Sequence, residues 1–157
     1  MQMKDYLIET FKYNDATNKK LLVKIKLLSD KDESVKLFSH LINCQYKWMA
    51  RIMHDPNGTT MSWWEPVYDL ERLEEEWTKS LSLWMNYIAA KTDEELSTET
   101  TFTGLDDAIW AATLQDIALQ LNYHSIHHRA QIQTILRQQG IEPDFVDYIG
   151  TKYRKLN

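Results

Sequence analysis

The sequence contains few of the residues that interrupt helices, with four glycines and three prolines among 157 residues. Gly and Pro are the main punctuation of β-rich folds, so their scarcity predicts long helices. The single cysteine, Cys44, excludes an internal disulfide and makes the cytoplasm the expected compartment. Apolar runs of about 18 residues, which a membrane-spanning helix requires, are also missing.

Basic charge is also limited: 18 Lys and Arg against 23 Asp and Glu give a net charge of −5. The sequence has no stripe of Lys and Arg that could follow a phosphate backbone, so no nucleic acid partner is expected. Residues 1–5 become charged and amphipathic at once, so neither a signal peptide nor a membrane partner is expected.

Apolar residues recur at helical spacing in four segments, separated by short turn signals or polar loops. The chain has no internal repeat, so we expect a single domain over residues 1–157. Four long amphipathic helices make a four-helix bundle the expected architecture. The predicted helices cover about 7–28, 34–54, 69–91 and 107–139.

The connections between these helices are also predicted. Asp32 or Ser34 is expected to cap the second helix, and Gly140 to end the fourth. Residues 55–68 form a long loop with an aromatic pair, and residues 92–105 a polar one. The connection between the first two helices is short, so these helices should pack antiparallel.

The fourth segment carries an unusual set of polar residues on its apolar face. His124 and His128 are four residues apart, which places both imidazoles on one side of a helix. This spacing suits two ligands of one metal ion, although no Glu follows His124, which excludes the H-E-x-x-H type of site. The predicted inward stripe is Trp110, Leu114, Ile117, Leu121, His124, His128, Gln131 and Ile135.

His40 lies on the inward stripe of the second segment and is the candidate for a third ligand. Three histidines around one ion leave coordination positions open, as in catalytic sites. The alternative is a bundle without metal, in which the three imidazoles are ordinary core residues with hydrogen-bond partners. Cys44, one turn after His40, is read as a small buried hydrophobe, with ligation as the alternative.

Further polar residues are candidates for contacts with the substrate or the ligands. Asn18 and Gln131 are expected to contact the ligands or the substrate, although Asn18, like Asn14, could instead fix the register of its helix. Arg129 either neutralises an anionic substrate or pairs with an acid of the C-terminal tail. The sequence does not choose between these two roles.

Three other features have simpler interpretations. His127 is expected to flank the site rather than ligate, and His54 to cap the end of its helix. Trp63 and Trp64 lie on a loop, where they form either the rim of a pocket or a dimer contact.

These motifs together resemble the DinB/YfiT-like family of small metal-binding proteins. The resemblance covers nearly the whole chain and rests most on His124-x-x-x-His128-Arg129-Ala130-Gln131. Weaker support comes from residues 11–14 with Asn18, and from residues 37–41 with Trp48. It implies an all-α four-helix bundle of the up-up-down-down type with a long crossover.

The resemblance also implies a divalent ion held by His40, His124 and His128. Zinc or nickel are the usual ions, with iron or manganese also possible, and family members often form homodimers. Two residues depart from the family pattern. Ala130 stands where Gly is commonest, and Gln45 stands where many relatives have an acid that could orient a ligand or take a proton.

The function implied by this resemblance is that of a metal-dependent enzyme acting on a small molecule. The leading hypothesis is an S-transferase that uses a low-molecular-weight thiol. A metal-dependent hydrolase is the second enzyme hypothesis, although the inward stripes show no obvious carboxylate that could act as its general base. The third hypothesis is a non-catalytic, metal-binding stress-response protein.

Overall fold

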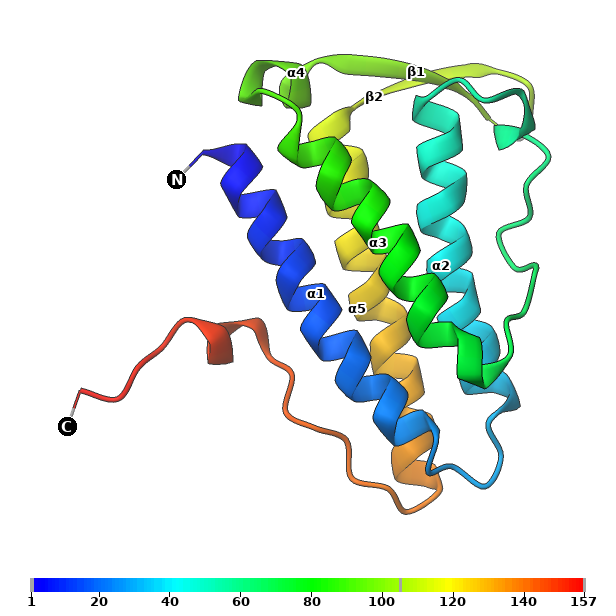
Figure 1. Ribbon diagram of the computed structural model, residues 1–157, viewed down its shortest axis with the longest axis vertical. Coiled ribbons are helices and arrows are strands. Elements are labelled where there is room, and N and C mark those ends of the chain that lie inside the picture. Colours follow the sequence, from blue (N-terminus) through cyan, green and yellow to red (C-terminus); the bar gives the residue numbers. More distant parts are fainter. Residues whose placement is uncertain (1, 105, 157) are drawn as a thin grey trace.

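The computed structural model describes residues 2–104 and 106–156. Four long helices dominate these residues (Figure 1). Their bounds are α1 (Met3–Ile25), α2 (Asp32–Ile52), α3 (Leu73–Ala89) and α5 (Leu114–Gln138). The expected mainly helical fold is therefore confirmed, whereas the exact type of bundle stays a prediction.

The four long helices form a bundle in which α1 and α2 occupy diagonal corners. Both make their main contacts with α3 and α5. In Figure 1, α1 and α5 run downward, whereas α2 and α3 run upward. The first two helices are antiparallel as expected, but they do not form a packed pair. The long connection after α2 places α3 beside both of them.

The connection between α3 and α5 is structured, unlike the predicted loop. It contains α4 (Asp93–Ser97) and two antiparallel strands, β1 (Glu99–Thr103) and β2 (Ile109–Thr113). The Thr-rich sequence of β1 and the β-branched and aromatic residues of β2 favour strands over helix. Leu105, in the predicted loop, lies outside the described residues.

The fourth helix consequently starts later than predicted. Thr113 caps its N-terminus by accepting a hydrogen bond from the Asp116 backbone N–H. Trp110, predicted to lie on the inward face of this helix, is instead 53 % exposed on β2. A β-hairpin that covers one end of the bundle therefore replaces the first turns of the predicted helix.

Other predicted ends differ in detail. Gly140 ends α5 with a positive φ of 79°, as expected for a glycine just after a helix. The residue before α2 is Lys31, so neither Asp32 nor Ser34 caps that helix with its side chain. The long connection between α2 and α3 is confirmed, with short 3-10 turns at Pro56–Gly58 and Leu70–Arg72.

The core is built around aromatic side chains, as the apolar stripe of the third segment predicts. Trp77 and Trp84 on α3 are buried, and each indole N–H has a partner. Trp77 donates to Asp15 Oδ1 at 3.0 Å, and Trp84 to the carbonyl oxygen of Gln45 at 2.9 Å. These bonds fix α3 against α1 and α2.

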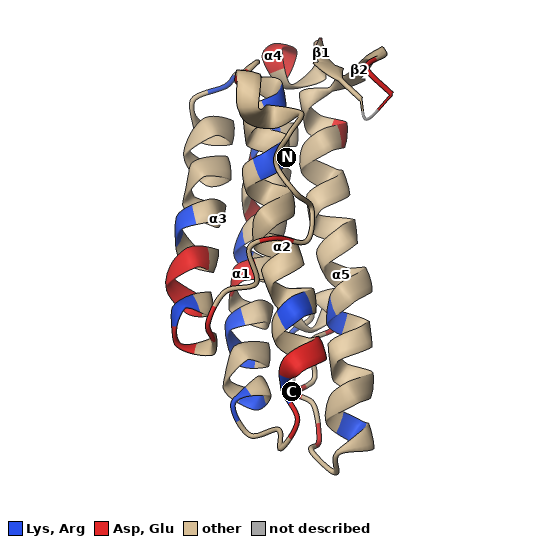
Figure 2. Cartoon of the chain, turned by 90° about the vertical axis from the view of Figure 1, so that its right-hand side faces the viewer, with Lys and Arg blue, Asp and Glu red and all other residues tan. Residues whose placement is uncertain are grey.

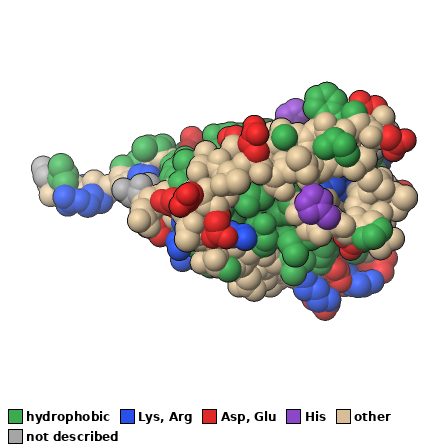
Figure 3. Space-filling model, turned by 90° about the horizontal axis from the view of Figure 1, so that it is seen from above, with side chains coloured by type: hydrophobic (Ala, Val, Ile, Leu, Met, Phe, Trp, Pro, Cys, Tyr) green, Lys and Arg blue, Asp and Glu red, His purple; other side chains and the backbone are tan. Residues whose placement is uncertain are grey.

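Residues of both charge signs are distributed along the helices (Figure 2). No helix among the described residues has the length and apolar character needed to cross a bilayer. The C-terminal segment follows α1, where Tyr13 donates a hydrogen bond to the carbonyl oxygen of Val146 and Tyr148 donates one to Glu9. Beyond this contact the last residues extend away from the bundle (Figures 1 and 3).

Candidate metal centre

The buried face of α5 determines which of its polar residues reach the interior. Over the second half of the helix its buried residues are Leu121, Asn122, Ser125, His128, Arg129, Ile132 and Leu136. Gln131, predicted to point inward, is exposed, and Ile135 is only partly buried. Residues spaced alternately three and four apart form a stripe that turns by about 20° per heptad around a straight helix. This turn explains why Gln131 and Ile135, near the end of the predicted stripe, are not buried.

His40 on α2 is held in one orientation by the loop that follows the helix. Its Nδ1 donates a hydrogen bond to the carbonyl oxygen of Trp63 at 2.7 Å. The Trp64 ring stacks on the imidazole, with centroids 3.8 Å apart and planes at 11°. Because Nδ1 carries the proton, the lone pair of Nε2 is free to face α5. This is how neighbouring groups commonly orient a metal ligand.

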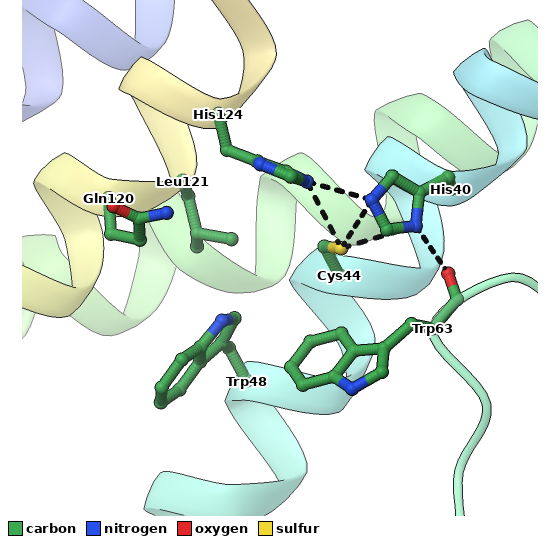
Figure 4. A pocket seen from close by; sticks show the side chains of 7 residues that line it. All are labelled: His40, Cys44, Trp48, Trp63, Gln120, Leu121 and His124. Carbon is green, nitrogen blue, oxygen red and sulfur yellow. Dashed lines mark hydrogen bonds between the residues drawn. The ribbon is translucent and has the colours of Figure 1, made fainter. Parts of the chain in front are cut away.

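Three donor atoms converge between α2 and α5 (Figure 4). His40 Nε2 lies 2.8 Å from His124 Nε2. Cys44 Sγ lies 3.6 Å from the first nitrogen and 3.7 Å from the second. A tetrahedral zinc ion bound by sulfur and nitrogen at usual bond lengths separates those atoms by about 3.6 Å. The donor set therefore fits a metal ion, once the two nitrogens separate to about 3.3 Å.

The third predicted ligand, His128, stands beside this cluster. Its ring centroid is 4.4 Å from that of His124 and 4.8 Å from that of His40. Its Nδ1 is 2.6 Å from Gln131 Oε1, an acceptor, which places the proton on Nδ1 and leaves Nε2 with a lone pair. Gln131 thus contacts a candidate ligand although it is exposed. Ligation by His128 stays a prediction.

The electrostatic setting favours neutral donor groups. Burial lowers the pKa of His40, His128 and His124, in the last case to about 4. Burial raises the pKa of the Cys44 thiol to about 12. The imidazoles therefore present free lone pairs at neutral pH. Cys44 stays protonated unless a cation displaces its proton.

The low pKa of His124 predicts how the metal-free protein responds to acid. In the unfolded chain this imidazole has its ordinary pKa of 6.5, against about 4 when folded. Between these two pH values the unfolded state binds more protons than the folded state, so the free energy of unfolding falls as the pH falls from 6.5 to about 4. Below about pH 4 the imidazole is protonated in both states, and His124 contributes no further change. We expect His124→Gln to flatten this dependence in thermal melts with a chelator. The exposed neighbour serves as control: an equal flattening by His127→Gln would contradict the assignment.

A cavity of about 210 Å³ opens directly onto the donor atoms. Its walls come from α2, α5 and the loop after α2 (Figure 4). The lining residues are His40, Cys44, Trp48, Trp63, Gln120, Leu121 and His124. Trp63 thus forms part of the cavity wall, one of the two roles considered for the aromatic pair. Trp64 is 42 % exposed and stacks on His40 from outside.

Asn18 and Arg129 do not line this cavity. The Asn18 amide donates to Ser125 Oγ at 2.8 Å. The Arg129 guanidinium donates to Asn18 Oδ1 at 2.9 Å and to Asn14 Oδ1 at 3.1 Å. The two asparagines therefore bind a buried arginine between α1 and α5. Arg129 forms no ion pair with an acid of the tail among the described residues.

The remaining candidates lie outside the donor cluster. His127 is exposed, and its ring centroid is 5.0 Å from that of His128. His54 is exposed just beyond the end of α2, with a positive φ of 53°. Gln45 is buried but does not line the cavity, and its side-chain oxygen has no hydrogen-bond partner among the described residues. The sequence indicated that Cys44 lies near the candidate ligands only through its spacing of four residues from His40.

The sequence as a whole has a counterpart among known protein families. A model of the DinB family matches residues 1–155. This chain belongs to the DinB family. No curated protein and no solved structure matches the sequence significantly. Membership of the DinB family is consistent with a metal-binding, enzyme-like fold, and the His40, Cys44 and His124 cluster is its potential metal site.

Proposed function

We propose that this DinB-family protein is a metal-dependent enzyme that transfers a low-molecular-weight thiol to an electrophilic small molecule. His40, His124 and His128 hold the divalent ion between α2 and α5. Zinc or nickel suits this nitrogen-rich set best, with iron or manganese as alternatives. When bound, the ion supplies one effect, which is to lower the pKa of a coordinated thiol and stabilise its thiolate.

The observation that carries this proposal is the composition of the cavity beside the donor atoms. Apart from the donor residues, its walls are formed by Trp48, Trp63, Leu121 and Gln120, and none of its described lining residues is an acid. Hydrolysis by an activated water usually needs a general base within hydrogen-bond reach. A thiol activated by a cation needs no such base, since its proton leaves to solvent. The cavity therefore favours thiol transfer over hydrolysis.

The residues around the cavity have defined tasks in this reaction. The Trp63 carbonyl and the Trp64 ring keep the His40 imidazole in place. Trp48 and Trp63 offer flat apolar surfaces that hold an electrophile and exclude water. The sulfur then forms a bond to the electrophilic carbon while the bond to the leaving group breaks, and the leaving group takes the electron pair.

Cys44 supports a second candidate function. With three histidines and this thiolate as ligands, the ion would have four protein donors and no open position. Such a site would staple the bundle without catalysing a reaction, as a metal-binding stress-response protein requires. The distance of Cys44 Sγ from both nitrogens specifically favours this alternative.

Cobalt(II) substitution separates the two functions. A thiolate bound to cobalt gives a charge-transfer absorption band in the near ultraviolet. For the enzyme we expect Cys44→Ala to bind cobalt as well as the wild type does, with the band appearing in both only after a small thiol is added. A band in the wild type before any addition, absent from Cys44→Ala, would instead identify a closed structural site.

Turnover provides the complementary measurement. The metal-loaded protein should consume thiol in the presence of a soluble electrophile such as an aryl halide, and the chelated protein should not. Equal rates with and without the ion would contradict a metal-dependent transferase.

A further inference from the structure

One face of α2 continues beyond the donor cluster and carries two buried cations. His40, Cys44, Lys47 and Arg51 follow one another at spacings of four, three and four, so they share a face of the helix. Lys47 is 2 % exposed and Arg51 is 8 % exposed. Neither has an acidic partner within 4.0 Å among the described residues. Buried charges are normally paired, so this pair needs an explanation.

The two cations differ in how many of their N–H groups have a hydrogen-bond partner. Lys47 Nζ donates to the carbonyl oxygens of Thr59 and Met61 in the loop after α2. Arg51 has no comparable bonds, because its Nε and Nη2 are buried without a hydrogen-bond partner among residues 2–104 and 106–156. Five N–H groups in a fixed fork make guanidinium well suited to two oxygens of one anion.

Aromatic rings hold the Arg51 guanidinium in position. Its central carbon lies 4.9 Å from the centre of the Trp63 ring, 5.3 Å from Trp48 and 5.7 Å from Phe102. Such contacts stabilise a cation but satisfy none of its hydrogen bonds. The side chain is thus oriented in advance, with its donors unused.

Arg51 lines two cavities at the hairpin end of the bundle. The larger, about 380 Å³, lies between Arg51, Trp63 and the hairpin, and the other, about 260 Å³, lies next to residues 54–59. Each contains one acid, but both acids are engaged elsewhere. Asp106 accepts from the Trp110 indole at 3.2 Å, and Asp55 accepts from the Asn57 backbone N–H at 2.8 Å. In the view onto this end, a small area of Lys or Arg side chain is visible beside a histidine (Figure 3).

The larger cavity is a neighbour of the one at the donor cluster, because Trp63 lines both. Along the helix, Cys44 and Arg51 are seven residues apart, which corresponds to about 10 Å. A single extended small molecule can therefore reach from the donor atoms, past the Trp63 ring, to the guanidinium. Among the described residues, the lining of the first cavity contains no acid that would repel the charge of such a molecule.

We infer that Arg51, assisted by Lys47, binds an oxyanion, carboxylate or phosphate, at the far end of a ligand whose thiol reaches the histidines. The inference rests on the proposed thiol transferase and names its substrate class, which is an acidic thiol about 10 Å long. Arg51 supplies the hydrogen bonds, and Lys47 adds positive charge from the next turn of the same helix.

The anion subsite is tested first on chelated protein, so that the result does not depend on the metal site. We expect phosphate or acetate to raise the melting temperature of the wild type more than sodium chloride at equal ionic strength. The more effective of the two probes identifies the head group. Arg51→Gln should weaken that binding by about tenfold to a hundredfold. The exposed Arg137, changed to Gln, is the matched control and should behave as the wild type does.

The second measurement uses metal-loaded wild type and needs no variant, so it stands even if Arg51→Gln does not fold. We compare the affinities of 8-mercaptooctanoate, its neutral counterpart 8-mercaptooctanol, and the short 3-mercaptopropionate. The long acid should bind best, because it alone joins a thiol to a distant carboxylate.

Two results would overturn the inference. One is stabilisation by phosphate and acetate no greater than by chloride. The other is equal affinity for the long acid and the long alcohol. In either case the cobalt and turnover experiments would still decide the proposed function on their own, since they use small thiols that carry no distant anion.

Discussion

Replacing Arg129 by Ala is expected to lower the free energy of unfolding by about 3–5 kcal/mol, the largest effect on stability of any single change considered for this chain. Arg129 is 2 % exposed in the middle of α5. Its Nη1 alone donates to Asn14, Thr17 and Asn18 on α1, at 3.1, 2.6 and 2.9 Å. Removing the guanidinium leaves these oxygens buried without their donor.

The size of the effect follows from the number of groups that lose a partner. A buried polar group left unsatisfied costs about 1–3 kcal/mol, and the side-chain oxygens of Asn14 and Asn18 both lose this donor. The Thr17 hydroxyl keeps its hydrogen bond to the carbonyl oxygen of Tyr13. The loss is partly offset because a buried cation without an acid no longer has to be desolvated. The cation–π contact with the Tyr13 ring, at 5.3 Å, is lost as well.

Urea denaturation of the chelated protein measures this effect without a contribution from metal binding. Arg137→Ala, on an exposed position of the same helix, is the control and should change stability by less than about 0.5 kcal/mol. A loss below about 1 kcal/mol for Arg129→Ala would mean that water satisfies the α1 side chains and that the arginine does not anchor the two helices.

The role of Arg129 shows what the sequence could and could not reveal. The motif around His124 drew attention to this arginine, but a single helix does not show which residues face its basic side chain. The polar residues that surround it, Asn14 and Asn18, were themselves visible as exceptions on an apolar stripe. Pairing them with Arg129 required the position of α1 relative to α5, which no local pattern contains.

Local periodicity predicted the four long helices and the loop between α2 and α3. It also placed His40 and His124 on inward stripes, and the structure brings their Nε2 atoms together. The hairpin before α5 was missed because the apolar residues from Trp110 onward continue a helical spacing by coincidence. There, strand propensity and the cap at Thr113 decide the local structure.

The donor cluster was only partly predictable for a related reason. The spacing of His40 and Cys44 showed that they share a face, but the contribution of Cys44 depends on how closely α2 approaches α5. The stacking of Trp64 on His40 comes from a loop without periodicity, so no pattern in the sequence indicated it. Loops that complete a site are the part least accessible to this kind of reasoning.

Replacing His124 by Ala is expected to lower the affinity for the divalent ion by more than about 100-fold, because even residues that merely orient a ligand change affinity by about 10- to 100-fold. His124 Nε2 is the atom that α5 contributes to the donor cluster. Its loss leaves His128 as the one proposed ligand that faces the α2 donors from α5. Metal content by mass spectrometry, with chelator competition, measures the change.

The control variant for this experiment is His127→Ala, which removes an exposed imidazole from the same turn of α5. It should retain a full equivalent of metal, and full retention by His124→Ala would refute the proposed centre. His128→Ala and Cys44→Ala complete the set. If three histidines hold the ion, the histidine variant loses it and the cysteine variant keeps it. If instead Cys44→Ala loses the ion and His128→Ala keeps it, the third ligand is the Cys44 sulfur. A substrate thiol would then have to compete with this thiolate for the ion.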